Sequence, residues 1–211
     1  MAPHLSRRTV MAAGAASLFV GRPAAASIAR MQTPAINMAL LQRARAALEA
    51  HRSAIAAPDR IAVIDFGLAS RVPRLHLIDL ERSTLRSVLV AHGRGSDPAY
   101  TGWLIRFSNT TGSDATSAGS YVTGTAYVGE HGHSMRLEGL DATNSNAQAR
   151  GIVMHSAWYV NEALAVSSGK IGRSDGCFAV APSALDAVLS HLGSGRFVYA
   201  DRIGTGLRNP A

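Results

Sequence analysis

The 211-residue sequence predicts a mainly β (α+β) fold with one helix in front of the strands and a short helix near the C-terminus. Three observations predict it. Apolar residues recur at steps of three and four in residues 34–55, which is typical of an amphipathic helix. Short β-like runs then alternate with turn-forming stretches. A second helical pattern at 182–192 precedes a last strand-like run.

The first 26 residues have the order of an export signal. Arg7 and Arg8 precede an apolar stretch at 10–20, and Ala24 to Ala26 supply the small residues of a cleavage site. Paired arginines favour the twin-arginine route, with an ordinary secretory signal or an uncleaved anchor as the alternatives. We therefore expect an exported protein of the periplasm or cell envelope. No run approaches the ~20 apolar residues of a membrane span, so none is expected in the mature form.

Residues 27–58 form a helical lead segment, because the pattern of 34–55 ends at Pro58. Residues 59–211 form one domain of ordinary size. Its strand-like runs are 61–66, 75–80, 85–92, 121–128, 135–137, 152–155 and 196–200. Turn-forming residues separate them at 93–98 and 108–120. The helix at 182–192 has Pro182 near its start and Gly193 just past its end.

Positive charge is modest and dispersed. Subtracting the three arginines of the leader from the formal net charge of +7 leaves +4, and Lys170 is the only lysine. The arginines are scattered singly and lack interleaved aromatic residues, which argues against a nucleic-acid partner.

The chain has a single cysteine, Cys177, in the run Gly172-Arg173-Ser174-Asp175-Gly176-Cys177-Phe178. Exported proteins often contain disulfides, but this sequence has no second cysteine with which Cys177 could form one. The thiol is therefore either inert in a core or kept for its reactivity. The residues Ser174, Asp175 and Gly176 form a turn whose N–H groups suit an oxyanion.

A base for this thiol is available at the end of a strand-like run. His155 closes the segment 151–155, and an imidazole is the usual group that turns a thiol into a nucleophile. Arg173 adds positive charge that could hold a substrate carboxylate. The alternative is that Cys177 is a small buried hydrophobe and His155 a polar residue at a strand end. The flanking glycine and the export signal favour catalysis by a Cys/His pair.

These residues also carry a family pattern. The C-terminal two-thirds of the chain resembles the murein L,D-transpeptidase catalytic domain family, the YkuD-like fold, whose motif looks like His-Gly-Ala-x-Tyr-Val followed by Gly-Arg-Ser-x-Gly-Cys-Pro-Ala. The matching residues are His155-Ser156-Ala157-Trp158-Tyr159-Val160 and Gly172-Arg173-Ser174-Asp175-Gly176-Cys177-Phe178-Ala179. Upstream segments at 119–124 and 127–141 match as well.

The resemblance implies a β-sandwich-like domain in which Cys177 attacks a peptidoglycan stem peptide after its third residue, a meso-diaminopimelate or similar residue. His155 would take the thiol proton, and a thioester acyl-enzyme would form. An amine from a neighbouring stem resolves it in an L,D-transpeptidase, and water resolves it in an L,D-carboxypeptidase. The resemblance implies no cofactor, and it makes acylation of the thiol by a carbapenem a natural probe.

Two positions depart from the pattern. Ser156 stands where the pattern has glycine, which places a hydroxyl beside the base, and Phe178 stands where it has proline, which adds an aromatic wall after the nucleophile. We also expect Ser156, Trp158 and His133 to line the substrate site.

Two other readings remain open. The histidines at 131, 133 and 155 with Asp141 could hold zinc in a metallopeptidase, although no His-Glu-x-x-His helix is present. A non-catalytic wall-binding module would keep the fold but would not need Cys177 and His155. We expect no metal and no cofactor.

Overall fold

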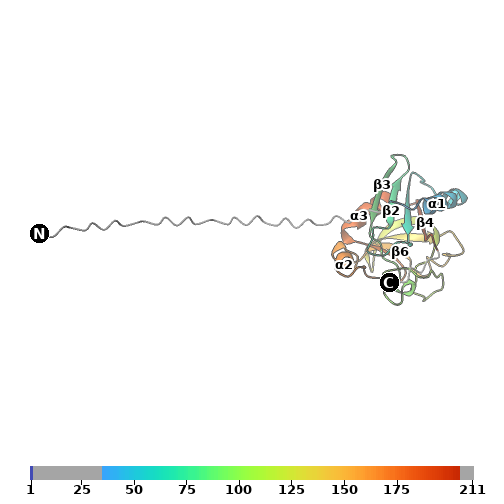
Figure 1. The fold of residues 1–211 in the computed structure, drawn as a ribbon. Helices are drawn as coiled ribbons and strands as arrows, with labels where there is room; N and C mark the ends of the chain where they lie inside the picture. Colours follow the sequence, from blue (N-terminus) through green and yellow to red (C-terminus); the bar gives the residue numbers. More distant parts are fainter. Residues whose placement is uncertain (2–34, 205–211) are drawn as a thin grey trace. The chain divides into compact units, whose positions relative to one another are not determined.

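The computed structural model describes residue 1 and residues 35–204. Apart from Met1, the predicted export signal at 1–26 lies outside the described residues. Within residues 35–204, three α-helices and eight strands follow one another (Figure 1). The helices are α1 (Met38–Ala50), α2 (Glu162–Ser167) and α3 (Pro182–Leu192). The strands are β1 (Arg60–Asp65), β2 (Leu75–Asp79), β3 (Thr84–Val88), β4 (Gly119–Gly129), β5 (Gly132–Gly139), β6 (Val153–Ser156), β7 (Phe178–Val180) and β8 (Phe197–Asp201).

The strands of the described residues form one sheet in the order β3-β2-β1-β8-β4-β5-β6-β7. Neighbours are antiparallel except for the parallel pairs β1 with β8 and β6 with β7. The sheet curls until its two edges approach, since Val90, just past β3, makes an antiparallel bridge with Val180 of β7. The predicted mainly β fold with a leading helix and a short helix after the cysteine is confirmed.

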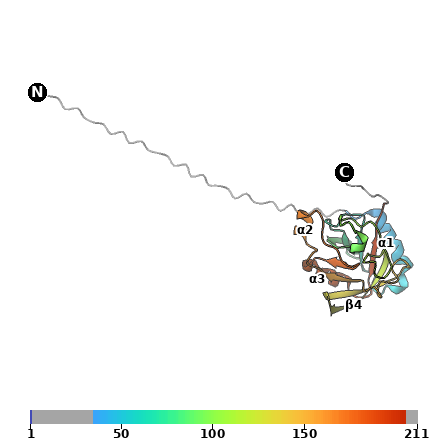
Figure 2. The same ribbon diagram turned by 90° about the horizontal axis from the view of Figure 1, so that it is seen from below.

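Both faces of the sheet centre are buried, as the alternation along β1 shows. Ala62 and Ile64 belong to the core that also contains the apolar side of α3. Ile61 and Val63 belong to a second core together with α1. Because successive residues of a strand point to opposite faces, α1 and α3 cover opposite faces of the sheet. Figure 1 and Figure 2 show these two helices on opposite sides of it.

Helix α1 is shorter than the predicted helix of residues 34–55. It begins after Asn37, whose side chain accepts the N–H groups of Ala39 and Leu40 at 3.0 and 3.3 Å. It ends at Ala50, and a 3₁₀ turn continues to Ala54. The apolar stripe is nevertheless the one that the spacing indicates, and it consists of Leu40, Leu41, Ala44 and Leu48.

Two elements were not expected from the sequence. Helix α2 has six residues and is capped by Asn161, and β7 has only three residues. Both are too short to show a period of their own. They lie together in a third core of buried residues, which consists of Leu89, Ala91, Ala157, Val160, Ala165, Ile171 and Ala179.

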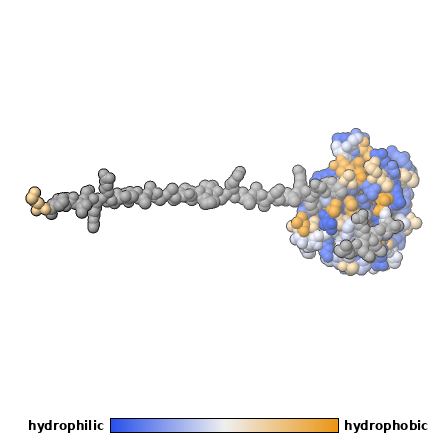
Figure 3. Space-filling view, in the orientation of Figure 1, coloured by the Kyte–Doolittle hydropathy of each residue, from blue (hydrophilic) through white to orange (hydrophobic). Residues whose placement is uncertain are grey.

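The outer surface mixes polar and apolar residues. Figure 3 shows hydrophilic residues over the outer end of the β2–β3 hairpin and hydrophobic residues gathered below it. Among the described helices, none combines the length and the hydropathy needed to cross a bilayer.

Candidate active site

Of the two residues expected to carry chemistry, one lies on a strand and the other directly before the parallel strand next to it. His155 is in β6, and Cys177 immediately precedes β7. The register pairs Met154 with Phe178, so one step back along both strands places Cys177 beside Val153. Residues two apart on a strand share a face, which puts the Cys177 and His155 side chains on the same face. Strand spacing and rise place their Cα atoms on the order of 8 Å apart.

The hydrogen bond of His155 fixes its protonation pattern. Its Nδ1 lies 2.9 Å from the backbone carbonyl oxygen of Ser156. A carbonyl only accepts, so neutral His155 carries its proton on Nδ1 and keeps a lone pair on Nε2. Burial lowers the pKa of His155, with a smaller contribution from His131. The ring of His131 is stacked on that of His155, with centroids 4.3 Å apart. The imidazole is therefore held neutral and able to accept a proton at Nε2.

Cys177 is 7% exposed, and its Sγ donates to the Gly151 carbonyl oxygen at 3.5 Å. Burial raises the pKa of the thiol, while the backbone N–H of Val153 and the charge of Arg150 lower it. Among residues 35–204 no hydrogen bond joins Sγ to His155. Burial thus favours a neutral thiol and a neutral imidazole, and the thiol hydrogen bond is directed to Gly151 and not to His155.

The turn before the sulfur is closed by Ser174. Its hydroxyl donates to the carbonyl oxygen of Cys177 at 2.7 Å and accepts the N–H of Gly176 at 3.2 Å. The N–H of Ser174 donates to the His92 carbonyl at 3.0 Å, which ties the turn to the chain after β3. The Gly176 N–H is used inside the turn, whereas the backbone N–H groups of Val153 and Cys177 interact with the sulfur and lower the pKa of the thiol. Oxyanion binding by Asp175 and Gly176 stays a prediction.

Glycine is required at one position in this turn and at one position in the chain that packs against it. Gly176 has φ 117°, and a Cβ there would lie 2.8 Å from Ile152 Cδ1 and 2.9 Å from the Ala115 carbonyl oxygen. A Cβ on Gly93 would lie 2.8 Å from the Gly176 Cα and 2.2 Å from the Asp114 carbonyl oxygen. The two glycine backbones therefore pack directly against each other, so the position of the sulfur depends on a close backbone contact.

A buried polar network lies behind the turn. Arg74 is 0% exposed, and its Nη2 lies 2.7 Å from His92 Nδ1. A guanidinium only donates, so His92 accepts at Nδ1 and carries its proton on Nε2, which is 3.4 Å from Asp97 Oδ2. Burial lowers the pKa of His92 to about 4. Since the His92 carbonyl accepts from Ser174, this network helps to fix the nucleophile turn.

Sequence reasoning missed Arg150. Its Nη1 donates to the Ser108 carbonyl at 2.8 Å and to Ser117 Oγ at 2.7 Å, and its Nη2 donates to the Ala115 carbonyl. These bonds tie the 108–117 loop against the turn, and the arginine charge acts on Cys177. Arg150 follows the polar segment 141–149, where nothing in the sequence sets it apart from the other single arginines.

The predicted substrate-binding residues are spread around the site. The guanidinium of Arg173 lies 4.2 Å from the Tyr100 ring centroid and donates to the Asp97 carbonyl, so it holds the neighbouring loop. Trp158 is 78% exposed. Ser156 provides the carbonyl that orients His155, and His133 is exposed in β5. Their contact with substrate stays a prediction.

Phe178 does not form the expected wall beside the nucleophile. It is fully buried, with its ring 5.4 Å from Tyr121 and 6.2 Å from Phe66. Next to Cys177 on a strand, it points to the opposite face and into the core that contains α3.

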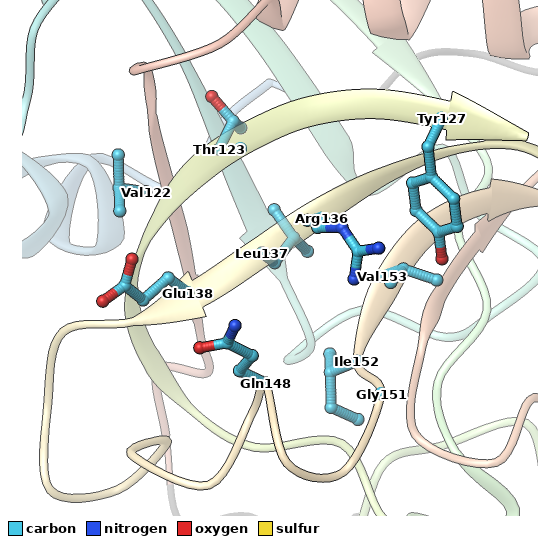
Figure 4. A pocket seen from close by; sticks show the side chains of 11 residues that line it. Val122, Thr123, Tyr127, Arg136, Leu137, Glu138, Gln148, Gly151, Ile152 and Val153 are labelled. Atoms are coloured by element: carbon cyan, nitrogen blue, oxygen red, sulfur yellow. The ribbon is translucent and has the colours of Figure 1, made fainter.

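A cavity of about 180 Å³ next to Gly151 opens on the face of the sheet that carries Cys177 and His155 (Figure 4). Strands β4, β5 and β6 and the segment before β6 line it. The polar lining residues are Thr123, Tyr127, Arg136, Glu138 and Gln148, and the remaining ones are Val122, Gly124, Leu137, Gly151, Ile152 and Val153. Helix α1 packs on this face of the sheet over β1 and β8. The cavity lies farther along the same face, over β4, β5 and β6.

Among residues 35–204 no three His, Cys, Asp or Glu side chains are grouped so that they could hold a metal ion. Asp141 of the zinc alternative instead accepts from His51 at 2.7 Å and from the Ser120 N–H at 2.6 Å.

Comparison with protein families matches residues 32–200 to a model described as L,D-transpeptidase catalytic domain. A search of curated proteins found no match. The similar solved structures include a helical cell shape determining protein from Campylobacter jejuni (14% identity, TM-score 0.45, 70% of this chain and 48% of that one). An L,D-transpeptidase from Mycobacterium smegmatis is also similar (13% identity, TM-score 0.42, 68% of this chain and 58% of that one). So is an L,D-transpeptidase solved in complex with imipenem (13% identity, TM-score 0.41, 68% of this chain and 59% of that one). This chain spans about half to three fifths of their lengths.

Proposed function

The chain belongs to the L,D-transpeptidase catalytic domain family, and on that premise we propose that it is a cysteine acyltransferase acting on peptidoglycan stem peptides. The observation that carries the proposal is the placement of Cys177 and His155 on one face of adjacent strands, with His155 Nε2 left as a proton acceptor. A binding module has no use for an imidazole oriented in this way beside a thiol.

The chemistry begins with proton transfer. The Cys177 proton passes from Sγ to His155 Nε2, and the thiolate attacks the carbonyl carbon of the third stem residue. The tetrahedral oxyanion accepts backbone N–H groups near the sulfur, and each such donor is worth about 3 kcal/mol in acyl transfer. When the C–N bond breaks, His155 returns the proton to the leaving amine of the fourth residue.

A thioester then links Cys177 to the donor stem. An amine of a second stem attacks the thioester carbonyl, loses a proton to His155 and forms the new amide, while the sulfur leaves as thiol. Water in place of the amine would give a shortened stem, which is the carboxypeptidase reaction. Because the substrate lies outside the cytoplasm, we also propose that the enzyme works in the periplasm or cell envelope.

The test uses the full chain, purified muropeptides with tetrapeptide stems, and mass spectrometry. We expect release of the fourth residue and crosslinked dimers from the wild type and no product from Cys177→Ala. Shortened stems without dimers would assign the carboxypeptidase reaction instead.

Acylation of the thiol gives a second readout. Imipenem, a carbapenem, should add its mass to the wild type and not to Cys177→Ala, whose circular dichroism should match the wild type. A folded wild-type protein that forms neither product nor adduct would overturn the proposal.

A further inference from the structure

A second imidazole covers the ring of the proposed base. The ring of His131 lies nearly parallel to that of His155, with an interplanar angle of 22° and centroids 4.3 Å apart. His131 is exposed to solvent, whereas His155 is 4% exposed. Contacts between aromatic rings are attractive and depend on the angle between them. One face of the buried base is therefore covered by a ring that another element supplies.

His131 reaches the base from the tip of the β4–β5 hairpin. Glu130 and His131 form the two-residue turn between these strands. The pairing of the hairpin shifts by one residue between positions 123 and 126 of β4, and such a bulge bends a hairpin and increases its twist. Residues 128–133 pair only with each other within the described part of the chain. The tip is thus an arm that extends past the neighbouring strands and bends over His155.

A buried serine fixes the end of the turn relative to the base. Ser134 is 0% exposed and is paired directly with His155 across β5 and β6. Its hydroxyl donates to the carbonyl oxygen of Gly132 at 3.1 Å, where the turn ends. Directly paired residues share a face of a sheet, so the residue beside His155 also holds the turn that carries His131. The fold itself therefore sets the place of the second ring.

The hydrogen bond to Ser156 and the ring contact restrict different motions of the His155 ring. A half-turn of the ring would put a carbon in place of Nδ1, so the bond to the Ser156 carbonyl selects one of two orientations. That single bond still allows the ring plane to tilt, which would turn Nε2 away from the thiol. A flat contact opposes the tilt, because tilting separates the rings at one edge and makes them overlap at the other.

We propose that His131 is a positioning residue for the base, and that the tip of the β4–β5 hairpin holds the plane of the His155 ring so that Nε2 faces Cys177. The inference rests on the proposed function, and it adds a residue that acts through His155. The role needs the flat face of His131 and not its proton, so an aromatic ring that does not ionise should replace it. The positive charge of His131 at acid pH has a separate effect, which is to lower the pKa of His155.

The pH dependence of kcat/KM separates these two effects. The full chain acts on a muropeptide with a tetrapeptide stem, and the plateau above the midpoint is the rate with a neutral base. His131→Ala should lower this plateau about fivefold, the size expected when an aromatic pair no longer favours the competent orientation. His131→Phe restores a flat ring and should return the plateau to within about twofold of the wild type. Both variants lack the charge, so both should move the midpoint upwards alike.

Glu130→Ala is the matched control, since it truncates the other exposed residue of the same turn. It should leave the plateau and the midpoint unchanged. Proton NMR detects the ring contact without turnover. The imidazole C–H signals of His155 should lie upfield in the wild type and in His131→Phe compared with His131→Ala, because these protons then lie over an aromatic face.

A plateau that His131→Phe does not restore, or a loss in His131→Ala no larger than in Glu130→Ala, would overturn the positioning role and leave the acyltransferase intact. Equal His155 proton shifts in the wild type and His131→Ala would overturn the ring contact on which the role depends. A wild type that forms neither product nor imipenem adduct would instead overturn the proposed function itself, and the positioning role with it.

Discussion

The nucleophile turn and the charged cavity lie on one face of the same sheet but are held in different ways. Around Cys177 the chain is buried and fixed by hydrogen bonds, and a Cβ on Gly93 or Gly176 would overlap neighbouring atoms. In the cavity, Arg136 and Glu138 are exposed and without ion pairs among the described residues. The turn that carries Cys177 is therefore fixed on all sides, whereas the two charged side chains of the cavity keep their polar groups free. Changes in the first region should have larger effects on activity than changes in the second.

The base should be the most sensitive side chain after the nucleophile. Replacing His155 with Gln keeps a polar side chain of similar size but removes the proton acceptor, and we expect about a thousandfold lower kcat/KM on a tetrapeptide donor. His51→Gln changes a histidine of the α1 end and should stay within about twofold. Equal losses in the two variants would contradict the role of His155.

The close backbone contact under the sulfur should be the next most sensitive feature. Gly176→Ala adds a Cβ at φ 117° against Ile152 and the Ala115 carbonyl, and we expect a loss of about 3 kcal/mol in the free energy of unfolding. Gly112→Ala is the matched control, because Gly112 also has positive φ but open space around it. It should cost about 1 kcal/mol. Urea denaturation measures the free energy of unfolding of both variants. Equal losses would show that the positive φ alone is costly and that the close contacts of Gly176 add nothing.

Arg150 both holds the 108–117 loop by hydrogen bonds and places a positive charge near Cys177. Arg150→Gln removes a positive charge near Cys177 and weakens the hold on the 108–117 loop, so imipenem acylation should slow about tenfold. The pH midpoint of acylation should move upwards, because the thiolate loses a stabilising cation. Arg71→Gln, at an exposed turn, is the control. An unchanged midpoint in Arg150→Gln would limit its role to the loop.

The buried histidines should make the free energy of unfolding depend on pH in the acid range. Burial lowers the pKa of His76 and of His92 to about 4, so between pH 4 and 6.5 the unfolded chain binds more protons than the folded one. Stability should therefore fall as pH falls through this window, by about 1 kcal/mol per histidine between pH 6 and pH 5. His76→Gln should reduce the slope. A free energy of unfolding that does not change over this range would contradict the burial of neutral imidazoles.

The smallest expected effect concerns the stacked imidazole. Burial lowers the pKa of His155, and protonation of Nε2 removes the base, so kcat/KM should rise with pH through a midpoint below 6.5. His131→Ala removes a neighbouring positive charge at acid pH and should move this midpoint upwards. A downward shift would show that His131 instead stabilises the protonated form.

The general fold could be predicted from the sequence, and Cys177 and His155 could be singled out as the candidate pair, because each has a local signal. Cys177 is the only cysteine and is preceded by glycine, and His155 ends a strand-like run. Arg150, Val153 and the network of Arg74 with His92 could not be predicted, because their roles arise from contacts between segments far apart in the chain. Phe178 was assigned to the wrong side, since a strand of three residues gives too little alternation to show which face a residue takes.

The hydrogen bond from His155 Nδ1 to the carbonyl of residue 156 has a genetic consequence. In many Cys/His enzymes a carboxylate or amide side chain orients the imidazole, and one codon change can delete it. Here the orienting acceptor belongs to the peptide backbone, which every amino acid supplies. The orientation of the imidazole therefore does not depend on which side chain residue 156 has, and the serine found there leaves it untouched.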